Sequence, residues 1–272
     1  MLRSMYSGVS GMRGFQTKLD VIGNNIANVN TVGFKSGRVM FKDIMSQTVS
    51  GVTAPTDGGQ GGVNAKQVGL GVSIGSIDTM HLQGSAMTTN NPTDLRIDGD
   101  GFFLVKLNGD QETPFLTRAG DFRPDAAGNL LTADGLHVVD SNGDPIQFED
   151  DVTAFSISSD GTIILSRADG TTEPGPQIGI GKVANPQGLE KIGGNLYRMT
   201  LNANPDGALE PTTANNAEAG TGSIVAGQLE MSNVDLTGEF TEMIVTQRGF
   251  QANSRIITTS DEILQEVVNL KR

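Results

Sequence analysis

The chain has 272 residues, a formal net charge of -12, no cysteine and two histidines, His81 and His137. The lack of cysteine excludes disulfides, thiolate nucleophiles and thiolate-bound metals, and the acidic charge argues against binding nucleic acid through its phosphates. Hydrophobic residues make up 36% of the sequence, which argues against one core that spans the whole chain.

Neither a signal peptide nor a membrane-spanning helix is expected. The first residues, MLRSMYSGVSGMRGFQTKLD, contain no continuous apolar stretch of the kind that a Sec signal peptide requires. No run of apolar residues in the sequence is long enough for a transmembrane helix. We therefore expect no membrane insertion.

Residues 1–32 are predicted to form a helix with a narrow apolar seam. Apolar residues recur there every seven positions over about four repeats, a spacing that is typical of helices buried along one stripe. This end of the chain is basic, with six Lys or Arg and one Asp in residues 1–42. The expected seam consists of Met5, Met12, Leu19 and Ile26, with Gly8, Phe15, Ile22 and Val29 three positions further on in each repeat.

The next segment, residues 33–91, is predicted to be an extended, glycine-rich linker. Eight glycines and Pro55 lie in the polar stretch of residues 51–75, and both residue types interrupt regular structure. Residues 69–75 resemble a dinucleotide-binding loop only superficially, because the third glycine is one position late and no helical pattern follows.

Residues 92–202 are predicted to form an all-β domain. Short apolar runs alternate there with Asx-Gly pairs, which favour hairpin turns because both central residues must tolerate positive φ. Several strands at spacings of about 8–12 residues indicate a sandwich or barrel. Residues 203–228 are expected to be a polar loop that returns toward the C-terminal end. The predicted turns are Asn108-Gly109, Asp134-Gly135, Asn142-Gly143, Asp160-Gly161 and Asp169-Gly170.

Residues 229–272 are predicted to form a second long helix that pairs with residues 1–32. Seven acidic and four basic residues make this end negative, which complements the basic N-terminal end. We therefore expect an α+β protein in which the terminal helices form a coiled-coil domain, within one copy or between copies, around the all-β domain. An ordinary amphipathic helix packed on its own domain is the alternative. The expected seam residues are Leu236, Met243, Phe250, Ile257 and Leu264, with Phe240, Ile244, Ile256, Ile263 and Val267 beside them.

No catalytic residues, cofactor site or metal site are predicted. Asp140, Asn142 and Asp144 imitate the first half of an EF-hand loop, but Pro145 and Asp151 stand where that loop needs Gly and Glu. A hairpin with acidic turn residues is the better interpretation. A Ser-His-Asp hydrolase would have to use one of the two histidines, and the sequence contains no nucleophile elbow.

Several parts of the sequence resemble the bacterial flagellar axial proteins, the rod and hook subunits. Residues 20–35, with the sequence DVIGNNIANVNTVGFK, resemble the N-terminal signature of this family. Residues 230–236, 242–244 and 247–251 resemble its C-terminal signature. The residues carried over from the N-terminal signature are Asn24, Asn25, Asn28, Gly33, Phe34 and Lys35. Three further segments resemble parts of the family's β domain, namely residues 98–103, 117–122 and 188–197.

The asparagines of the N-terminal motif are expected at a helix end. Asparagine side chains can bond backbone groups in place of the helical ladder, and asparagine tolerates left-handed backbone. Gly33 is expected to permit a turn, and Phe34 and Phe41 are expected to act as aromatic anchors beyond it.

The resemblance implies a structural protein without catalysis or cofactor. It implies a subunit that polymerises into the tubular flagellar hook, similar to the short hook subunits of Gram-positive bacteria, which transmits motor torque and encloses the export channel. A subunit of the distal rod is the alternative, and a secreted β-domain adhesin with coiled-coil termini is a more remote one. The implied partners are further copies of the chain, the axial proteins above and below, and the flagellar type III export apparatus. The implied location is the flagellar basal body or hook, reached without a cleaved signal peptide.

Overall fold

The structure is a computed structural model that describes residues 2–55, 61–108, 111, 113–148, 152–167, 169–205 and 209–270. The chain divides into two compact units. Each unit is built from segments that are separated in the sequence. Unit 1 comprises Met1–Ala27, Gly37–Thr79 and Asp235–Arg272, and unit 2 comprises Asn28–Ser36 and Met80–Val234.

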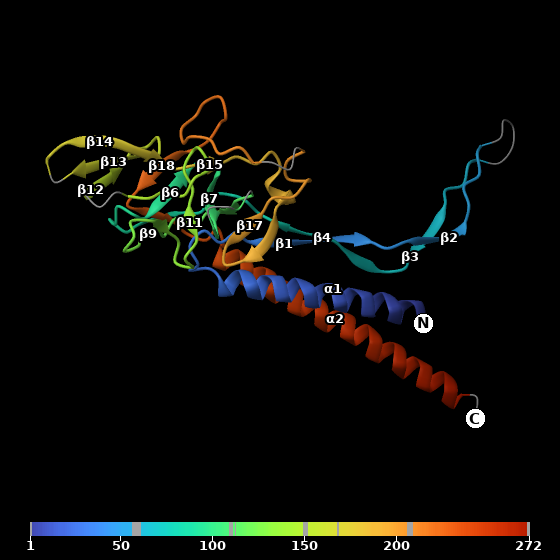
Figure 1. The fold of residues 1–272 in the computed structure, drawn as a ribbon. Coiled ribbons are helices and arrows are strands. Elements are labelled where there is room, and N and C mark those ends of the chain that lie inside the picture. Colours follow the sequence, from blue (N-terminus) through green and yellow to red (C-terminus); the bar gives the residue numbers. More distant parts are fainter. Residues whose placement is uncertain are drawn as a thin grey trace. The chain divides into compact units, whose positions relative to one another are not determined.

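Unit 1 contains two long helices, α1 (Leu2–Ala27) and α2 (Leu236–Asn269), which pack against each other. The helices run antiparallel, because Gly8 near the start of α1 lies against Ile257 in the second half of α2. Figure 1 shows the two ends of the chain at the same end of this helix pair. An α+β architecture with a helix at each end of the chain is therefore present.

Both helices are shorter than the sequence predicted. The α1 helix ends at Ala27, and residues 28–36 belong to unit 2. The α2 helix begins after Asp235, whose carboxylate accepts a hydrogen bond from the backbone nitrogen of Thr237 at 3.0 Å. This N-cap satisfies one of the free backbone donors at the helix start, and Glu239 in the first turn complements the helix dipole.

Residues 37–55 and 61–79 of unit 1 form a two-stranded antiparallel ribbon, which we call the β arm (Figure 1). The sequence predicted an extended, glycine-rich linker here, and the structure pairs parts of it into strands, with Phe41 opposite Ile74 and Val39 opposite Ile77 in the strand register. β-Branched and aromatic residues favour strands, and in these two segments they prevail over the neighbouring glycines. The strands are β1 (Gly37–Asp43), β2 (Ser46–Ser50), β3 (Lys66–Gly69) and β4 (Val72–Thr79), with β1 paired to β4 and β2 paired to β3.

Unit 2 is built around an eight-stranded antiparallel sheet. A separate sheet of three strands and a short 3₁₀ helix, η1 (Pro186–Gly188), accompany it. In spatial order the large sheet contains β16 (Glu190–Gly193), β17 (Leu196–Arg198), β8 (Phe115–Thr117), β7 (Phe102–Lys106), β11 (His137–Val138), β10 (Leu130–Leu131) and β9 (Arg123–Pro124), with β15 (Ile180–Gly181) beside β7. The smaller sheet contains β12 (Val152–Ile157), β13 (Thr162–Arg167) and β14 (Thr172–Gln177).

Two further strand pairs join segments that are far apart in the sequence. β5 (Ala86–Thr88) pairs with β19 (Gln228–Glu230), and β6 (Leu95–Asp98) pairs with β18 (Ser223–Ala226). Residues 203–228, predicted as a polar loop, therefore end in strands of unit 2. The prediction missed them because the polar stretch before them masks the short apolar run Ile224–Val225.

The predicted hairpin turns are confirmed where the structure describes them. Gly135, Gly143, Gly161 and Gly170 all adopt positive φ, with values of 83°, 96°, 77° and 78°. The predicted turn at Asn108-Gly109 lies partly outside the described residues, because Gly109 is not among them.

The two units differ in how they bury apolar side chains. In unit 2, Phe103 and Phe122 are fully buried and meet edge to face, with ring centroids 5.1 Å apart, inside a large apolar cluster. A second cluster surrounds Leu104 and Tyr197. In the described part of unit 1, the buried large apolar side chains are those of Ile22 and Val39, which keep 4% and 8% of their surface exposed.

Candidate functional site

Small residues line the contact between the two helices of unit 1. Gly8 and Gly11 are buried there, and a Cβ added to Gly11 would lie 2.8 Å from the side-chain nitrogen of Asn253. A Cβ added to Gly249 would lie 2.8 Å from the ring of Phe15. Because the side chains at a helix contact set the distance between the axes, these glycines allow a close approach.

The structure places the predicted seam residues in different environments. Ile22 is buried, and most of the others are only half-buried, so pairing within one copy covers part of the seam. Val29 lies in unit 2, outside α1. The half-buried seam residues of unit 1 are Met5, Met12, Phe15, Leu19, Ile26, Met243, Ile257 and Leu264. The exposed ones are Leu236, Phe240, Phe250, Ile244, Ile256, Ile263 and Val267.

Polar residues also take part in the buried face of α2, which the heptad analysis missed. Thr246 and Ser260 are buried, and their hydroxyls donate to the carbonyls of Glu242 and Ile256 at 2.6 and 2.7 Å. Hydroxyls satisfied within their own helix can be buried without another partner. The α2 face therefore alternates apolar and small polar groups.

Asn25 of the family motif joins three elements of unit 1. Its amide nitrogen donates to the carbonyl of Gly37 at 2.8 Å and to the carboxylate of Glu239 at 2.9 Å, and its amide oxygen accepts from the nitrogen of Gly37 at 2.9 Å. Burial raises the pKa of Glu239, while the bond from Asn25 opposes that shift. Asn25 therefore connects α1 with β1 and α2.

The motif asparagines do not adopt the left-handed backbone that the sequence allowed them. Asn24, Asn25, Asn28 and Asn30 all have negative φ. Asn28 follows the last residue of α1, and its side-chain oxygen accepts a hydrogen bond from the hydroxyl of Thr31 at 3.1 Å. Asn25 and Asn28 therefore act at the helix end through side-chain hydrogen bonds rather than through an unusual φ.

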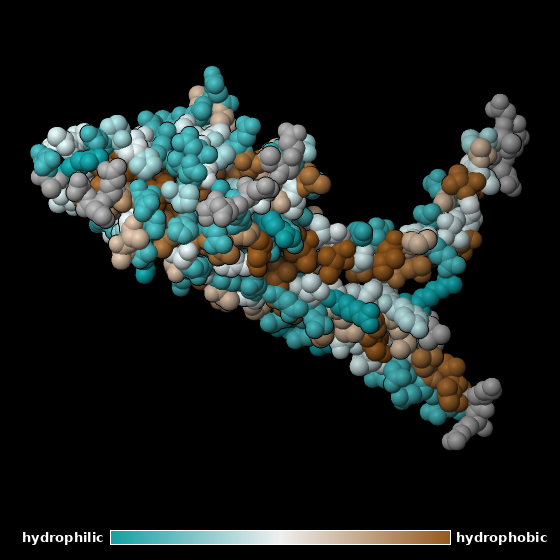
Figure 2. All heavy atoms as spheres, in the orientation of Figure 1, coloured by the Kyte–Doolittle hydropathy of each residue, from teal (hydrophilic) through white to brown (hydrophobic). Residues whose placement is uncertain are grey.

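Unit 1 exposes many large apolar side chains, which we call the open apolar surface. Figure 2 shows hydrophobic residues gathered along the β arm and near the end of α2. Phe41, a predicted anchor, is 37% exposed and meets Phe15 edge to face at 5.8 Å. On α2 the surface comprises Leu236, Phe240, Ile244, Val245, Phe250, Ile256, Ile263, Val267, Val268 and Leu270. On the β arm it comprises Met40, Phe41, Ile44, Met45, Val49, Val52, Val63, Val68, Leu70 and Ile77.

Three sequence motifs meet in one buried ion cluster inside unit 2. Lys35 of the N-terminal motif and Arg118 of the β domain both bind the carboxylate of Glu230 in the C-terminal motif, at 2.5 and 3.3 Å. Glu230 is fully buried and Lys35 is 1% exposed. The nitrogen of Gly84 donates to the same carboxylate at 2.9 Å, and Lys35 also donates to the carbonyl of Leu82 at 2.7 Å. Both carboxylate oxygens of Glu230 are therefore satisfied, as a buried charge requires.

Gly33 and Phe34 fix the turn that carries Lys35 into the cluster. Gly33 has a φ of +69°, and a Cβ there would lie 2.6 Å from the nitrogen of Ala119. Its own nitrogen donates to the carbonyl of Glu230 at 2.8 Å. Phe34 is buried beneath Lys191, whose ammonium lies 4.2 Å from the ring centroid. The chain therefore turns at Gly33, and the ring of Phe34 is buried directly after the turn.

Burial shifts the pKa values of the groups in and around the ion cluster. Desolvation lowers the pKa of Lys35 and of Arg118, and Glu230 opposes this shift in both. Desolvation also lowers the pKa of His81 to about 4 and raises that of Tyr197 to about 12. His81 and Tyr197 are therefore neutral at neutral pH, and Glu230 supplies the negative charge that the two cations face.

The described residues include two histidines and many acidic side chains, which are the usual nitrogen and oxygen ligands of metals. No group of three or more His, Asp or Glu side chains within them is placed to hold a metal ion. Asp140 accepts hydrogen bonds from the nitrogens of Asn142 and Asp144 at 2.8 and 2.9 Å, so these residues close a hairpin turn. Asp151, the last position of the EF-hand comparison, lies outside the described residues. Among the described helices, none is both long and apolar enough to span a membrane.

The two ends of the chain form the helices of unit 1, and the segments that follow α1 and precede α2 meet in the ion cluster of unit 2. This arrangement defines an α+β class of chain. Family models match along the chain. They are flagella basal body rod protein at residues 5–35, flagellar hook protein FlgE/F/G D1 domain at 96–165, and flagellar basal body rod FlgEFG protein C-terminal at 225–270.

Relatives match over the full length of the chain. It is 57% identical over 272 residues to the flagellar basal-body rod protein FlgG of Bacillus subtilis, with 100% of both chains covered. It is 36% identical over 274 residues to the FlgG of Borreliella burgdorferi and 30% identical over 450 residues to the flagellar hook protein FlgE of that organism, again with 100% of both chains covered. The chain belongs to the bacterial flagellar axial protein family of rod and hook subunits.

Lys35, Arg118 and Glu230 stand in three separate sequence motifs, and no contact among them was predicted. The sequence signal for this cluster was the presence of a charged residue in each motif beside apolar residues. A charged side chain that is buried in a core needs a partner of opposite charge. The position of Glu230 depends on the pairing of β5 with β19. The polar loop before β19 gave no indication of that pairing in the sequence.

Proposed function

We propose that the chain is a structural subunit that polymerises into an axial tube of the bacterial flagellum and has no catalytic role. The observation that carries this proposal is the open apolar surface of unit 1, because large exposed apolar patches are typical of association sites. Unit 2 buries its core within one copy. Contacts with neighbouring copies would cover the helices and the β arm, and assembly would stabilise them as binding stabilises a partly folded segment.

Within the flagellum we propose the distal rod as the location, which is the alternative to the hook that the sequence analysis favoured. The identity of 57% over all 272 residues to a rod protein supports this choice. The hook relative aligns over 450 residues and therefore has sequence that this chain lacks. The hook is the second candidate, because the hook proteins of Borreliella burgdorferi and Treponema pallidum match the whole chain at 30% and 28% identity.

The proposed subunit works through its contacts with other proteins. Its partners would be further copies of itself and the axial proteins above and below it in the tube. It would reach the growing tip through the flagellar export apparatus. The tube would enclose the export channel and transmit torque from the motor.

Immunogold electron microscopy of isolated hook-basal bodies tests the proposed location. We expect label on the straight rod segment. Label along the curved hook would favour the second candidate, and label on neither part would reject both, provided that the antibody binds the purified protein.

Negative-stain microscopy of the purified chain at rising concentration tests polymerisation itself. Straight or curved tubes are expected above a critical concentration. A stable monomer at every concentration that binds sugar or matrix would favour the adhesin.

A further inference from the structure

We propose that the groove between α1 and β4 receives the C-terminal end of α2 from a second copy of the chain. This inference rests on the proposed polymerisation and names one contact that would build the polymer.

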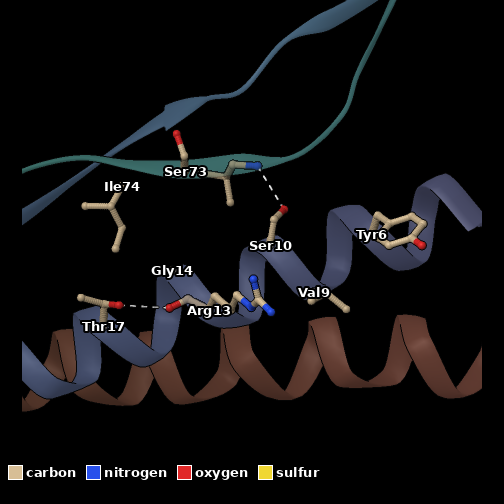
Figure 3. Close-up of a pocket in the computed structure, with 9 residues that line it drawn as sticks. Tyr6, Val9, Ser10, Arg13, Gly14, Thr17, Ser73 and Ile74 are labelled. Atoms are coloured by element: carbon tan, nitrogen blue, oxygen red, sulfur yellow. Dashed lines mark hydrogen bonds between the residues drawn. The ribbon is translucent and has the colours of Figure 1, made fainter.

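The groove offers apolar walls and an unpaired cation (Figure 3). It has a volume of about 500 Å³ and is lined by one side of α1 and the start of β4. Tyr6 at its edge is 72% exposed. Arg13 is exposed and makes no ion pair within the described part of the chain. Val9 and Ile74 contribute apolar surface between them.

The floor of the groove is held by a hydrogen bond between its two walls. The hydroxyl of Ser10 accepts from the backbone nitrogen of Val72 at 3.3 Å and donates to the carbonyl of Ser7 at 2.8 Å. A Cβ added to Gly71 would lie 2.4 Å from that hydroxyl, so glycine is needed for this approach. The groove therefore exists in the single copy, before any partner binds.

The end of α2 carries the complementary groups. Ile263, Glu266, Val267 and Leu270 follow one another at spacings of three, one and three residues, so they share one face of the helix. All four side chains are exposed. Glu266 makes no ion pair among the described residues. This face combines apolar side chains with one anion, as the groove combines apolar walls with one cation.

The α2 helix of the same copy cannot supply this contact. Because Gly8 lies against Ile257 in an antiparallel pair, Arg13 is level with about residue 252 of α2. Glu266 is fourteen residues further along, which is roughly 20 Å at about 1.5 Å per residue. A Glu266 that pairs with Arg13 must therefore come from another copy.

A contact of this kind propagates. The groove and the helix end are different patches of one subunit, so the contact is heterologous, and each copy that fills a neighbour's groove leaves its own groove free. Heterologous contacts produce closed rings or open helical filaments rather than dimers. The contact thus suits the growth of a tube from identical subunits.

A charge-swap cycle on the full chain tests the pairing. Arg13→Glu and Glu266→Arg are each expected to raise the critical concentration for polymerisation roughly tenfold, because like charges then meet in the groove. The double variant should return to within about threefold of the unchanged protein, as a restored direct pair predicts. Arg255→Glu, which changes an exposed arginine of α2 outside the groove, is the control and should change the critical concentration less than about threefold.

Disulfide trapping tests the same contact without altering charge. The chain has no cysteine, so Val9→Cys combined with Val267→Cys introduces the two thiols of interest and no others. Oxidation of the polymer should produce a ladder of covalent multimers, because each copy would link to two neighbours. Either single variant should give at most dimers.

The outcomes separate this inference from the proposed function. If the unchanged protein fails to polymerise at any concentration, the proposed function itself fails. If it polymerises, but the charge variants behave like Arg255→Glu or the double variant does not recover, the pairing of Arg13 with Glu266 is wrong. Polymers of the double-cysteine protein that give no ladder would likewise overturn the inference and leave polymerisation standing.

Discussion

Unit 1 and unit 2 differ in how far their large apolar side chains are buried within a single copy of the chain. In unit 2, side chains such as Phe103 and Leu104 are fully buried within one copy. In unit 1, Phe240 and Val267 are about half exposed, and much of the β arm is apolar and open to solvent. Both units come from one sequence, so the overall composition does not reveal which part of the chain buries its apolar side chains within a single copy. We infer that unit 2 completes its core alone and that unit 1 completes its core with neighbouring copies.

The largest expected effect concerns how much the buried ion cluster at Glu230 contributes to the free energy of unfolding of unit 2. Glu230→Gln would leave Lys35 and Arg118 buried without a counter-charge, and breaking a buried pair costs about 3–5 kcal/mol. Urea unfolding of the full chain, followed by circular dichroism, should show this loss in the transition of unit 2. The control is Glu190→Gln, since its pair with Arg198 is exposed on both sides and should contribute less than about 1 kcal/mol. Equal effects of the two variants would contradict the importance of the cluster.

The next effect tests the close approach of the helices in unit 1. A side chain at Gly249 would meet the ring of Phe15, so Gly249→Val should weaken the pairing of α1 with α2 by about 1–3 kcal/mol. The measurement is the thermal melting of the helical signal in the monomer. Gly23→Ala is the control, because a Cβ there meets nothing within 4 Å and alanine favours a helix. If Gly249→Val melts like Gly23→Ala, the helices are further apart than described.

Phe250→Ala should act on assembly more than on folding. Phe250 is 37% exposed in the single copy, so contacts between copies have apolar area left to cover. Losing that contribution, about 1–2 kcal/mol, would raise the critical concentration roughly tenfold at about 1.4 kcal/mol per factor of ten. The melting of unit 2 should not change, because Phe250 lies in unit 1. The control is Gln251→Ala at the exposed neighbouring position. If Phe250→Ala polymerises at the critical concentration of the unchanged protein, Phe250 is not part of the assembly surface.

The smallest expected effect is the pH dependence of unit 2 through His81. Desolvation lowers the pKa of His81 to about 4, below its ordinary value of 6.5. The neutral form is therefore favoured in the folded state, and its contribution to stability is present above about pH 6.5 and is lost as the pH falls toward 4. Lys35, Arg118 and Lys191 strengthen the shift.

The test compares the melting temperatures of the unchanged protein and His81→Phe at pH 7 and pH 4.5. The unchanged protein should lose more stability than the variant as the pH falls. Comparing the two also removes the contributions of acids such as Asp121, whose pKa is raised by burial. Parallel losses in both proteins would show that His81 does not titrate in this range.

Local sequence signals predicted the elements that depend on local chemistry. The heptad spacing indicated both terminal helices, and the Asx-Gly pairs indicated turns such as those at Gly135 and Gly161. The resemblance of the motif around Gly33 indicated the family. Each of these depends on neighbouring residues, which is why the sequence alone was sufficient.

The remaining features depend on contacts between distant segments. The strands of the β arm were not predicted because the glycines of residues 51–75 indicate irregular structure, while the apolar residues that favour strands lie on either side of them. The ion cluster at Glu230 needed the pairing of β5 with β19, which joins residues more than a hundred positions apart. The buried Thr246 was missed because a heptad of apolar residues says nothing about small polar groups between them.

Hydrogen exchange, resolved along the chain in monomer and in polymer, tests the difference between the two units most directly. Local stability follows buried apolar contact, so in monomer the amides of α1, α2 and the β arm should exchange faster than those of the large sheet of unit 2. On polymerisation, protection should rise across unit 1 and stay unchanged in unit 2. Strong protection of both helices in verified monomer, with no further gain in the polymer, would contradict the account, because unit 1 would then be complete within a single copy.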